Sequence, residues 1–252
     1  MYLYIYDGQA GKRKFLKTLT NIEKKLTDLG LNGKILRLKE SKNPVTSIQK
    51  EINKGCKTVV VVGNDKTVNQ TVNALAESHI NNSRLKPVLG VIPLEGKNNT
   101  IASALGINDP LEACDIILAR RNVKINLGKI NDSYFISEVN IYNSPKKLEI
   151  NKNYSISLSY TGDISALNLS PSISGNPFDD ILDLYIFTKN KGAFPLLSGQ
   201  KNGKSYFPLK HLHIHHHKAS LLIDNAHTFK APATISVASQ KINVIVGKDR
   251  NF

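Results

Sequence analysis

The stretch from residue 59 to residue 75, VVVVGNDKTVNQTVNAL, constrains the fold more than any other part of the chain. Four consecutive β-branched residues, Val59–Val62, predict a strand that is buried on both faces of a parallel sheet. The run ends at Gly63, and apolar residues then recur at helical spacing, at Val68, Val72 and Leu75. The pattern predicts a strand, a tight loop and a helix. Such a loop presents backbone N–H groups and the positive end of the helix to a bound phosphate.

The loop from Gly63 to Thr67 resembles the Gly-Gly-Asp-Gly-Thr phosphate loop of the diacylglycerol kinase catalytic domain family. That superfamily also contains bacterial lipid kinases, sphingosine kinases and, more remotely, NAD kinases. Gly63, Asp65 and Thr67 match the motif, whereas Asn64 and Lys66 stand where the family has glycine. The resemblance implies that all five residues bind nucleotide. A carboxylate in such a loop, here Asp65, could hold a magnesium ion or take a proton from a hydroxyl.

Lys66 falls in the first turn of the predicted helix, where a cation opposes the helix dipole. A bound phosphate would relieve this repulsion, so we hypothesise that Lys66 contacts the nucleotide phosphates in place of a glycine amide. A lysine that faces solvent is equally consistent with the sequence.

A second motif lies at residues 89–107, LGVIPLEGKNNTIASALGI. Family members carry a similar strand with Pro-Leu-Gly, a Thr-Gly-Asn loop and an alanine-rich helix that ends in Leu-Gly-Ile. In this chain two charged residues replace small loop residues, and the loop is one residue longer. The resemblance implies nucleotide contacts from Gly96, Asn98 and Asn99. The matching positions are Pro93, Leu94, Asn99, Ala102, Leu105 and Gly106.

The loop after the first predicted strand, Asp7–Lys12, is glycine-rich and basic. The spacing before Lys12 is too short for a P-loop. Gly8 and Lys12 are nevertheless candidates for contacts with the nucleotide phosphates.

Two patterns of secondary structure divide the chain. Strands alternate with amphipathic helices up to residue 120, which predicts an α/β domain with a parallel sheet over residues 1–120. Many short alternating strands follow, which predicts an antiparallel β-sandwich domain over residues 121–252. The expected fold class is α/β plus all-β, similar to the NAD kinase and diacylglycerol kinase superfamily. The predicted strands include 2–6, 34–38, 59–62, 88–93, 234–238 and 242–246.

Acidic residues of the second half complete the resemblance. Asp180 and Asp183 match an Asp-Gly-Leu-Leu-Asp segment whose carboxylates lie near a metal site in some members, although strand-edge carboxylates in solvent would give the same pattern. Asp224 matches the aspartate of a family Asp-Gly-Glu turn that is assigned to catalysis or magnesium binding, and Ala226 replaces the glutamate. Either Asp224 or Asp65 then carries the chemistry alone, or the activity is weak or lost.

Composition restricts the partners and the compartment. The chain has 252 residues, a formal net charge of +14 and a pI near 9.6, which favours anionic partners or reflects a lysine-rich proteome. With two cysteines, no signal-peptide pattern and no apolar run of membrane-spanning length, we expect a cytoplasmic protein, with any contact to an anionic membrane being peripheral. The alternating histidines from His211 to His217 predict a basic, pH-sensitive strand rather than a metal site.

The resemblance implies an ATP-dependent, Mg²⁺-dependent kinase that phosphorylates a lipid hydroxyl such as that of diacylglycerol. A non-catalytic relative that binds nucleotide or lipid is the main alternative, because Asn64, Lys66, Glu95 and Ala226 all depart from the family near the expected chemistry. An NAD kinase is a third alternative. No nucleic-acid partner is expected, since only charge would support one, and a homodimer is compatible with the sequence.

Overall fold

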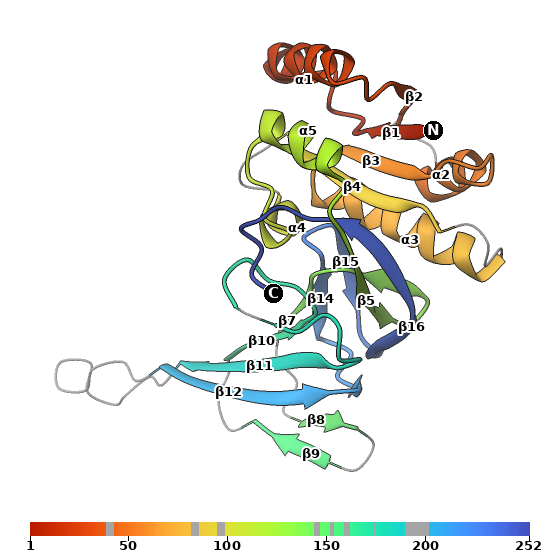
Figure 1. Cartoon of the computed structure of the whole chain (residues 1–252). Helices are drawn as coiled ribbons and strands as arrows, with labels where there is room; N and C mark the ends of the chain where they lie inside the picture. Colours follow the sequence, from red (N-terminus) through yellow and green to blue (C-terminus); the bar gives the residue numbers. More distant parts are fainter. Residues whose placement is uncertain are drawn as a thin grey trace.

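A computed structural model of the chain describes residues 1–38, 43–81, 86–94, 99–143, 147–151, 154–158, 162–173, 175–189 and 202–252. Figure 1 shows that an α/β half and a β-rich half lie one below the other and share strands.

A parallel sheet forms the centre of the first half. Its strands run in the order β2-β1-β3-β4, every neighbouring pair is parallel, and Gly63 lies opposite Pro93 in the register of β3 and β4. The side chains of Val59–Val62 are fully buried, which confirms the predicted burial of this strand on both faces. The four strands are β1 (Tyr2–Tyr6), β2 (Gly33–Arg37), β3 (Thr58–Gly63) and β4 (Val88–Pro93).

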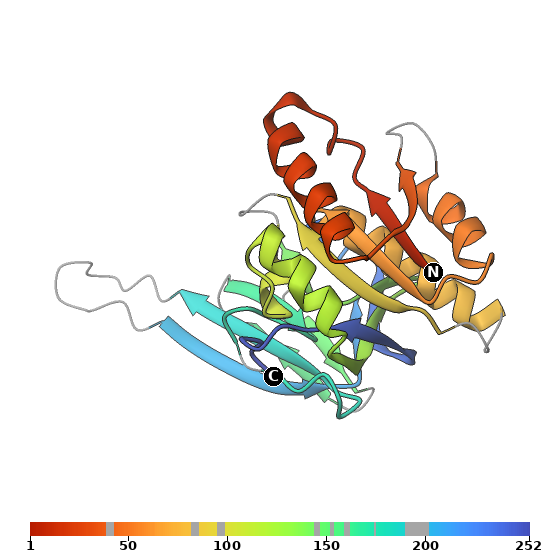
Figure 2. The ribbon, with the colours of Figure 1, turned by 45° about the horizontal axis from the view of Figure 1, so that its top comes forward.

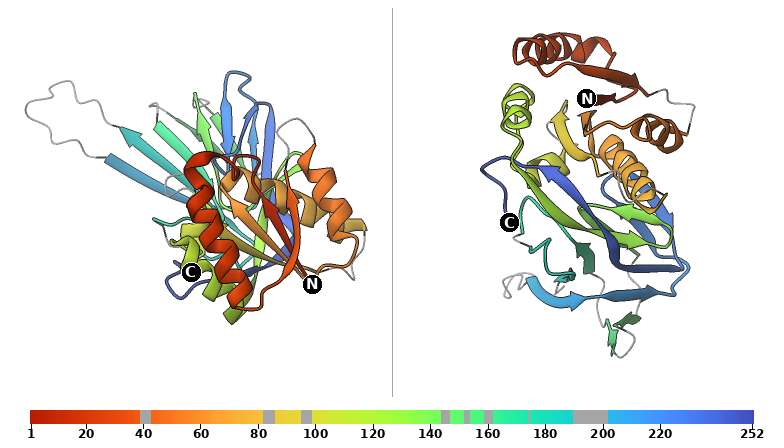
Figure 3. Two further views of the ribbon diagram at one scale, coloured as in Figure 1. Left: turned by 90° about the horizontal axis from the view of Figure 1, so that it is seen from above. Right: turned by 45° about the vertical axis from the view of Figure 1, so that its right-hand side comes forward.

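Helices cover both faces of this sheet. The pair α1 and α5 packs on one face and the pair α2 and α3 on the other (Figures 2 and 3). Apolar residues at helical spacing, such as Leu19, Ile22 and Leu26, face the core and are buried. The helical elements are η1 (Arg13–Phe15), α1 (Leu16–Asp28), α2 (Pro44–Ile52), α3 (Asp65–Asn81), α4 (Thr100–Ala104) and α5 (Pro110–Ala119).

The second half consists of short strands. One sheet in the described residues is antiparallel, in the order β12-β11-β10-β7-β14-β15, while the other strands extend the first sheet. Together with the parallel sheet, this arrangement confirms the predicted fold class. The strands are β5 (Asn122–Ile130), β6 (Ser133–Phe135), β7 (Glu138–Tyr142), β8 (Lys147–Ile150), β9 (Tyr154–Ser157), β10 (Gly162–Leu167), β11 (Leu182–Lys189), β12 (Asn202–Leu209), β13 (His211–Ile214), β14 (Ser220–Ile223), β15 (His227–Lys230) and β16 (Ala233–Ile245).

The last strand, β16, joins the two halves. Where the sequence predicted strands 234–238 and 242–246, the structure has one long strand whose register shifts between Val237 and Lys241. Its first part pairs with β13, and its second part pairs parallel with β4, so that Asn243 lies opposite Val88. Residues from both sides of position 120 therefore share one core, since Val244 packs in the same cluster as the strands of the first half.

A second hydrophobic core fills the β-rich half. Its members come from the inward faces of both sheets and include Phe135, Leu184 and Leu212. No helix in the described ranges is long and apolar enough to cross a membrane.

Candidate functional site

Three loops meet at the carboxyl edge of the parallel sheet. They follow β1, β3 and β4, which are adjacent strands, so the predicted nucleotide residues of all three loops are brought to one edge. The Thr67 hydroxyl donates to Asp7 at 2.5 Å, which joins the first two loops. The Leu94 amide donates to the Gly63 carbonyl at 3.1 Å, which joins the last two. A Cβ on Gly63 would lie 2.9 Å from the Cβ of Asp7, so this close approach requires glycine.

The loop after β3 ends in an N-cap. The Asn64 side chain accepts a hydrogen bond from the Thr67 amide at 3.2 Å, as a cap residue does in the first turn of a helix. Asparagine at a family glycine position thus caps α3. Lys66 is exposed in the same turn, and in the described part of the chain no printed partner restrains its ammonium group.

Asp65 points away from this loop into the protein. Only 2% of its surface is exposed, and its carboxylate accepts hydrogen bonds from the Thr100 amide at 2.9 Å, the Thr100 hydroxyl at 2.5 Å and the Ile101 amide at 3.0 Å. Burial raises the pKa of Asp65, and the hydrogen bonds oppose that rise. In this geometry Asp65 holds the start of α4 against the phosphate loop.

Asp224 is held even more tightly. It lies in the turn between β14 and β15, is fully buried, and accepts from four donors: the amides of Ile136, Ser137 and Glu138 and the side chain of Asn69, at 2.8 to 3.0 Å. Burial raises the pKa of Asp224 to about 6 in spite of these donors. A carboxylate in contact with four donors and closed to solvent has no free position for a substrate hydroxyl.

Two asparagines that the sequence analysis did not single out connect the halves of the molecule. Asn69 donates to Asp224 at 2.8 Å and to the Tyr134 carbonyl at 3.1 Å, and Asn73 both donates to the Tyr134 carbonyl and accepts from the Tyr134 amide. The signal was present, because two asparagines four residues apart share one face of a helix. Their partners could not be deduced without the fold.

The turn after β14 also contacts the loop after β4. The Asn225 side chain donates to the Thr100 hydroxyl at 3.0 Å, and that hydroxyl in turn donates to Asp65. Asp224 and Asn225 both have positive φ, at 47° and 51°, which asparagine and aspartate tolerate better than most residues. One short turn therefore reaches both the core and the phosphate loop.

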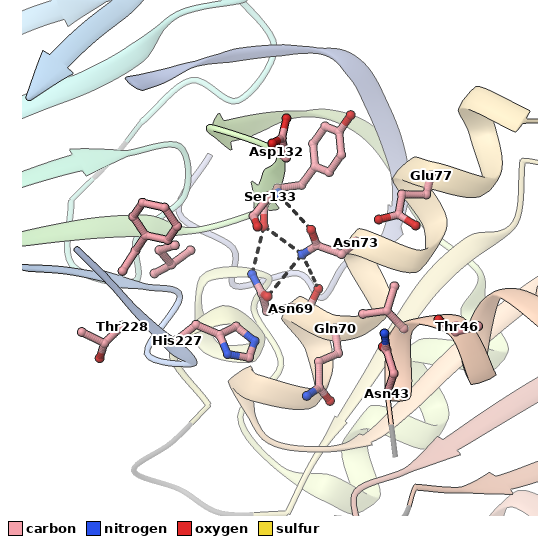
Figure 4. Close-up of a pocket in the computed structure, with 14 residues that line it drawn as sticks. Asn43, Thr46, Asn69, Gln70, Asn73, Glu77, Asp132, Ser133, His227 and Thr228 are labelled. Atoms are coloured by element: carbon pink, nitrogen blue, oxygen red, sulfur yellow. Dashed lines mark hydrogen bonds between the residues drawn. The ribbon is translucent and has the colours of Figure 1, made fainter. Parts of the chain in front are cut away.

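A pocket of about 320 Å³ lies between α3 and the β14–β15 hairpin (Figure 4). Its wall on α3 is polar and its wall on the hairpin is largely apolar. His227, at the start of β15, lines this pocket together with Gln70. Burial lowers the pKa of His227, and the nearby charge of Lys66 lowers it further. The polar wall comprises Asn69, Gln70, Asn73 and Glu77, and the apolar residues include Ile223 and Phe229.

The residues present fit a nucleotide at the three loops. Asn99 is 6% exposed, and within the described chain its Nδ2 is buried without a hydrogen-bond partner, so a donor is available beside the end of β4. Gly8 and Lys12 are exposed in the loop after β1. Two other predicted nucleotide residues, Gly96 and Asn98, lie outside the described residues.

The carboxylates described near the cleft do not fit a magnesium site. Asp65 and Asp224 are saturated by protein donors, as above. Asp180 forms an ion pair with Lys241 at 2.8 Å, while Asp183 accepts from Tyr206 at 3.1 Å, so the two predicted metal ligands serve separate contacts. Among the described residues no group of three or more His, Cys, Asp or Glu side chains could hold a metal ion.

The histidine cluster is only partly a strand. His211 and His213 belong to β13, whereas His215 follows its end. The rings of His213 and His215 stack with centroids 6.2 Å apart, and His215 lies 3.0 Å from Glu149. These contacts lie on β13 and β8, away from the three loops.

The fold and the site define a class of two-lobed proteins with a glycine-containing phosphate loop in the cleft. The model of the diacylglycerol kinase catalytic domain matches residues 1–130, and the chain belongs to this family.

The similar proteins agree with this assignment. A diacylglycerol kinase of Staphylococcus carnosus (strain TM300) is 29% identical over 134 residues, which are 53% of this chain and 42% of that relative. A diacylglycerol kinase of Staphylococcus aureus (strain MRSA252) is 30% identical over 134 residues, which are 53% of this chain and 41% of that relative. The matched segment thus spans less than half of these curated relatives.

A crystal structure of a diacylglycerol kinase from Bacillus anthracis str. Sterne superimposes with a TM-score of 0.74 at 19% identity. The superposition covers 99% of this chain and 97% of that one. At this identity the likeness establishes the shared fold.

Proposed function

We propose that the protein is a phosphotransferase of the lipid-kinase type. ATP binds at the loops after β1, β3 and β4, and its γ-phosphoryl group passes to a lipid hydroxyl, such as that of diacylglycerol, in the pocket beside α3. The observation that carries this proposal is the course of α3. Its first turn belongs to the phosphate loop, and its second turn lines the pocket. Four residues separate Lys66 from Gln70, or about 6 Å along the helix, so a phosphoryl group held at Lys66 lies next to the pocket.

Three kinds of donor would bind the nucleotide phosphates. The exposed lysines at 12 and 66 supply positive charge, the first turn of α3 supplies its dipole, and Asn99 supplies an unpaired amide. Transfer then relies on positioning and electrostatic stabilisation, as in other phosphoryl transfers.

The pocket supports a lipid headgroup as the acceptor. Polar side chains of α3 face the apolar side chains of Ile223 and Phe229, which suits a hydroxylated group attached to apolar chains. The net charge of +14 would bring the protein to an anionic membrane surface.

Binding without transfer is the second candidate. It is favoured by the contacts of Asp65 and Asp224, which leave neither carboxylate free, and by Ala226 at the position of the family glutamate. In that case the cleft would sense or sequester a nucleotide.

One assay separates the candidates. The purified protein is incubated with γ-labelled ATP, Mg²⁺ and diacylglycerol or a lipid extract in mixed micelles, with NAD in a parallel reaction. Labelled lipid supports the kinase, and labelled NADP would show an NAD kinase instead. ATP binding in a calorimetric titration without any labelled product would replace the proposal by the binding function.

Lys66→Ala tests the phosphate site directly. A charge-assisted hydrogen bond contributes about 1.5–3 kcal/mol, so the substitution should weaken ATP binding at least about tenfold. The control is Lys24→Ala, which removes the same charge from the exposed face of α1. Equal ATP affinity of the Lys66 variant and the wild-type protein would exclude the contact.

A further inference from the structure

His227 lies where a base for the acceptor hydroxyl is needed. It lines the pocket and is close enough to Lys66 for that charge to affect its protonation. The phosphate loop and the pocket therefore meet at this side chain. In Figure 4 its imidazole extends toward the same space as the side chain of Gln70, which comes from the opposite element.

The other titratable groups of the pocket are less suited to this role. Glu77 accepts a hydrogen bond from Gln49 on α2, and Asp132 is exposed in the turn between β5 and β6. Burial raises the pKa of Tyr134, so that it stays protonated at neutral pH. Of these groups, only His227 is perturbed by the charge of Lys66.

The turn before His227 explains why the carboxylates are not used. Asp224 points into the core, and Asn225 points to Thr100, so both are committed to holding the lobes together. Three residues after Asp224, the chain has begun β15 and the side chain faces the pocket.

We propose that His227 is the general base of the phosphoryl transfer. This inference rests on the proposed lipid-kinase function. The O–H bond of the acceptor breaks and its proton passes to an imidazole nitrogen, while the acceptor oxygen forms a bond to the γ-phosphorus. The bond from the γ-phosphorus to the β,γ-bridging oxygen breaks, and ADP leaves with that electron pair. His227 is exposed on one side and returns the proton to water.

The protonation state agrees with this role. Burial and Lys66 both lower the pKa of His227 below its usual 6.5, so the ring is neutral at pH 7 and can accept a proton. Glu77 and Asp132 line the same pocket and would favour the charged ring, but the burial and the positive charge of Lys66 outweigh them.

The test uses the full chain with ATP, Mg²⁺ and the acceptor that gives labelled product. His227→Gln should lower kcat by about 100-fold or more and should abolish the loss of activity that the wild-type protein shows at acid pH. ATP affinity in the titration and the melting temperature should stay unchanged. His227→Gly should regain activity when free imidazole is added. His211→Gln, on exposed β13, serves as the control and should behave as wild type.

Each outcome is decisive. A wild-type kcat in His227→Gln, or no rescue of His227→Gly by imidazole, overturns the role of His227 and leaves the kinase in place. ATP binding without turnover of any acceptor by the wild-type protein overturns the kinase and the base together. A flat pH profile in the wild-type protein also excludes a histidine base.

Discussion

Asp224→Asn tests what the buried carboxylate contributes to stability. The substitution keeps the shape of the side chain but replaces one acceptor oxygen by an NH₂ group. Two of the four donors around Asp224 would then face a donor instead of an acceptor. A buried donor without a partner costs about 1–3 kcal/mol, so two of them cost about 4 kcal/mol in the free energy of unfolding.

An opposing effect reduces this loss at neutral pH. Burial raises the pKa of Asp224 from 3.8 to about 6, which means that the folded protein holds the charged form at a disadvantage. Each pKa unit corresponds to about 1.4 kcal/mol, so the amide removes a penalty of about 3 kcal/mol at pH 7. The net loss expected at pH 7 is therefore about 1 kcal/mol.

The difference should grow in acid. Because the folded-state pKa is raised, the wild-type protein gains stability as the pH falls through 6, and the gain is complete below 3.8. The asparagine variant lacks this gain. At pH 5 the wild-type protein should exceed the variant by about 2.5 kcal/mol, since one pH unit adds about 1.4 kcal/mol.

Urea denaturation at pH 7 and pH 5 measures both values. Far-UV circular dichroism is the suitable signal, since the chain has no tryptophan. Asp28→Asn, exposed at the end of α1, is the control and should change stability by less than about 0.5 kcal/mol at either pH. If the difference between wild type and Asp224→Asn narrows from pH 7 to pH 5, the four donors dominate over burial and the reasoning is wrong.

Two further substitutions test the packing of the first half. Gly106→Ala should lower stability by more than about 2 kcal/mol, because Gly106 has φ +73° and a Cβ there would lie 2.6 Å from the Arg250 amide nitrogen. Gly30→Ala, at φ +67° with nothing within 4 Å, should lose only about 1 kcal/mol, and equal losses in urea denaturation would rule out the clash. Lys25→Ala should lower the melting temperature very little, since its 2.5 Å ion pair with Asp115 is solvent-exposed and contributes less than about 1 kcal/mol; a loss above 2 kcal/mol would contradict this.

The part of the site that depends on local pattern was predictable. The valine run, the break at Gly63 and the spacing of Val68 and Val72 predict the strand, the loop and the helix, and the structure has all three. Once the strands are parallel and adjacent, their carboxyl ends meet at one edge. The grouping of Gly8, Gly63 and Asn99 therefore follows from the order of the elements.

The roles of the two carboxylates did not follow from their motifs. The nearest partners of Asp65 are 35 and 36 positions away in sequence, and those of Asp224 are 86 to 155 positions away. A motif identifies a side chain, but only the fold decides whether that side chain points to a ligand or to backbone amides. His227 carries no motif and becomes a candidate only because the hairpin places it in the pocket.

The sequence by itself determined the family, the fold class and the edge of the sheet at which phosphate would bind. Those properties depend on periodicity and on residues close together in the chain. Tertiary structure alone decided that β16 returns to pair with β4 and that Asn69 reaches Asp224. Strand pairing and buried hydrogen bonds join residues that are distant in sequence, and their geometry is fixed only when the cores pack.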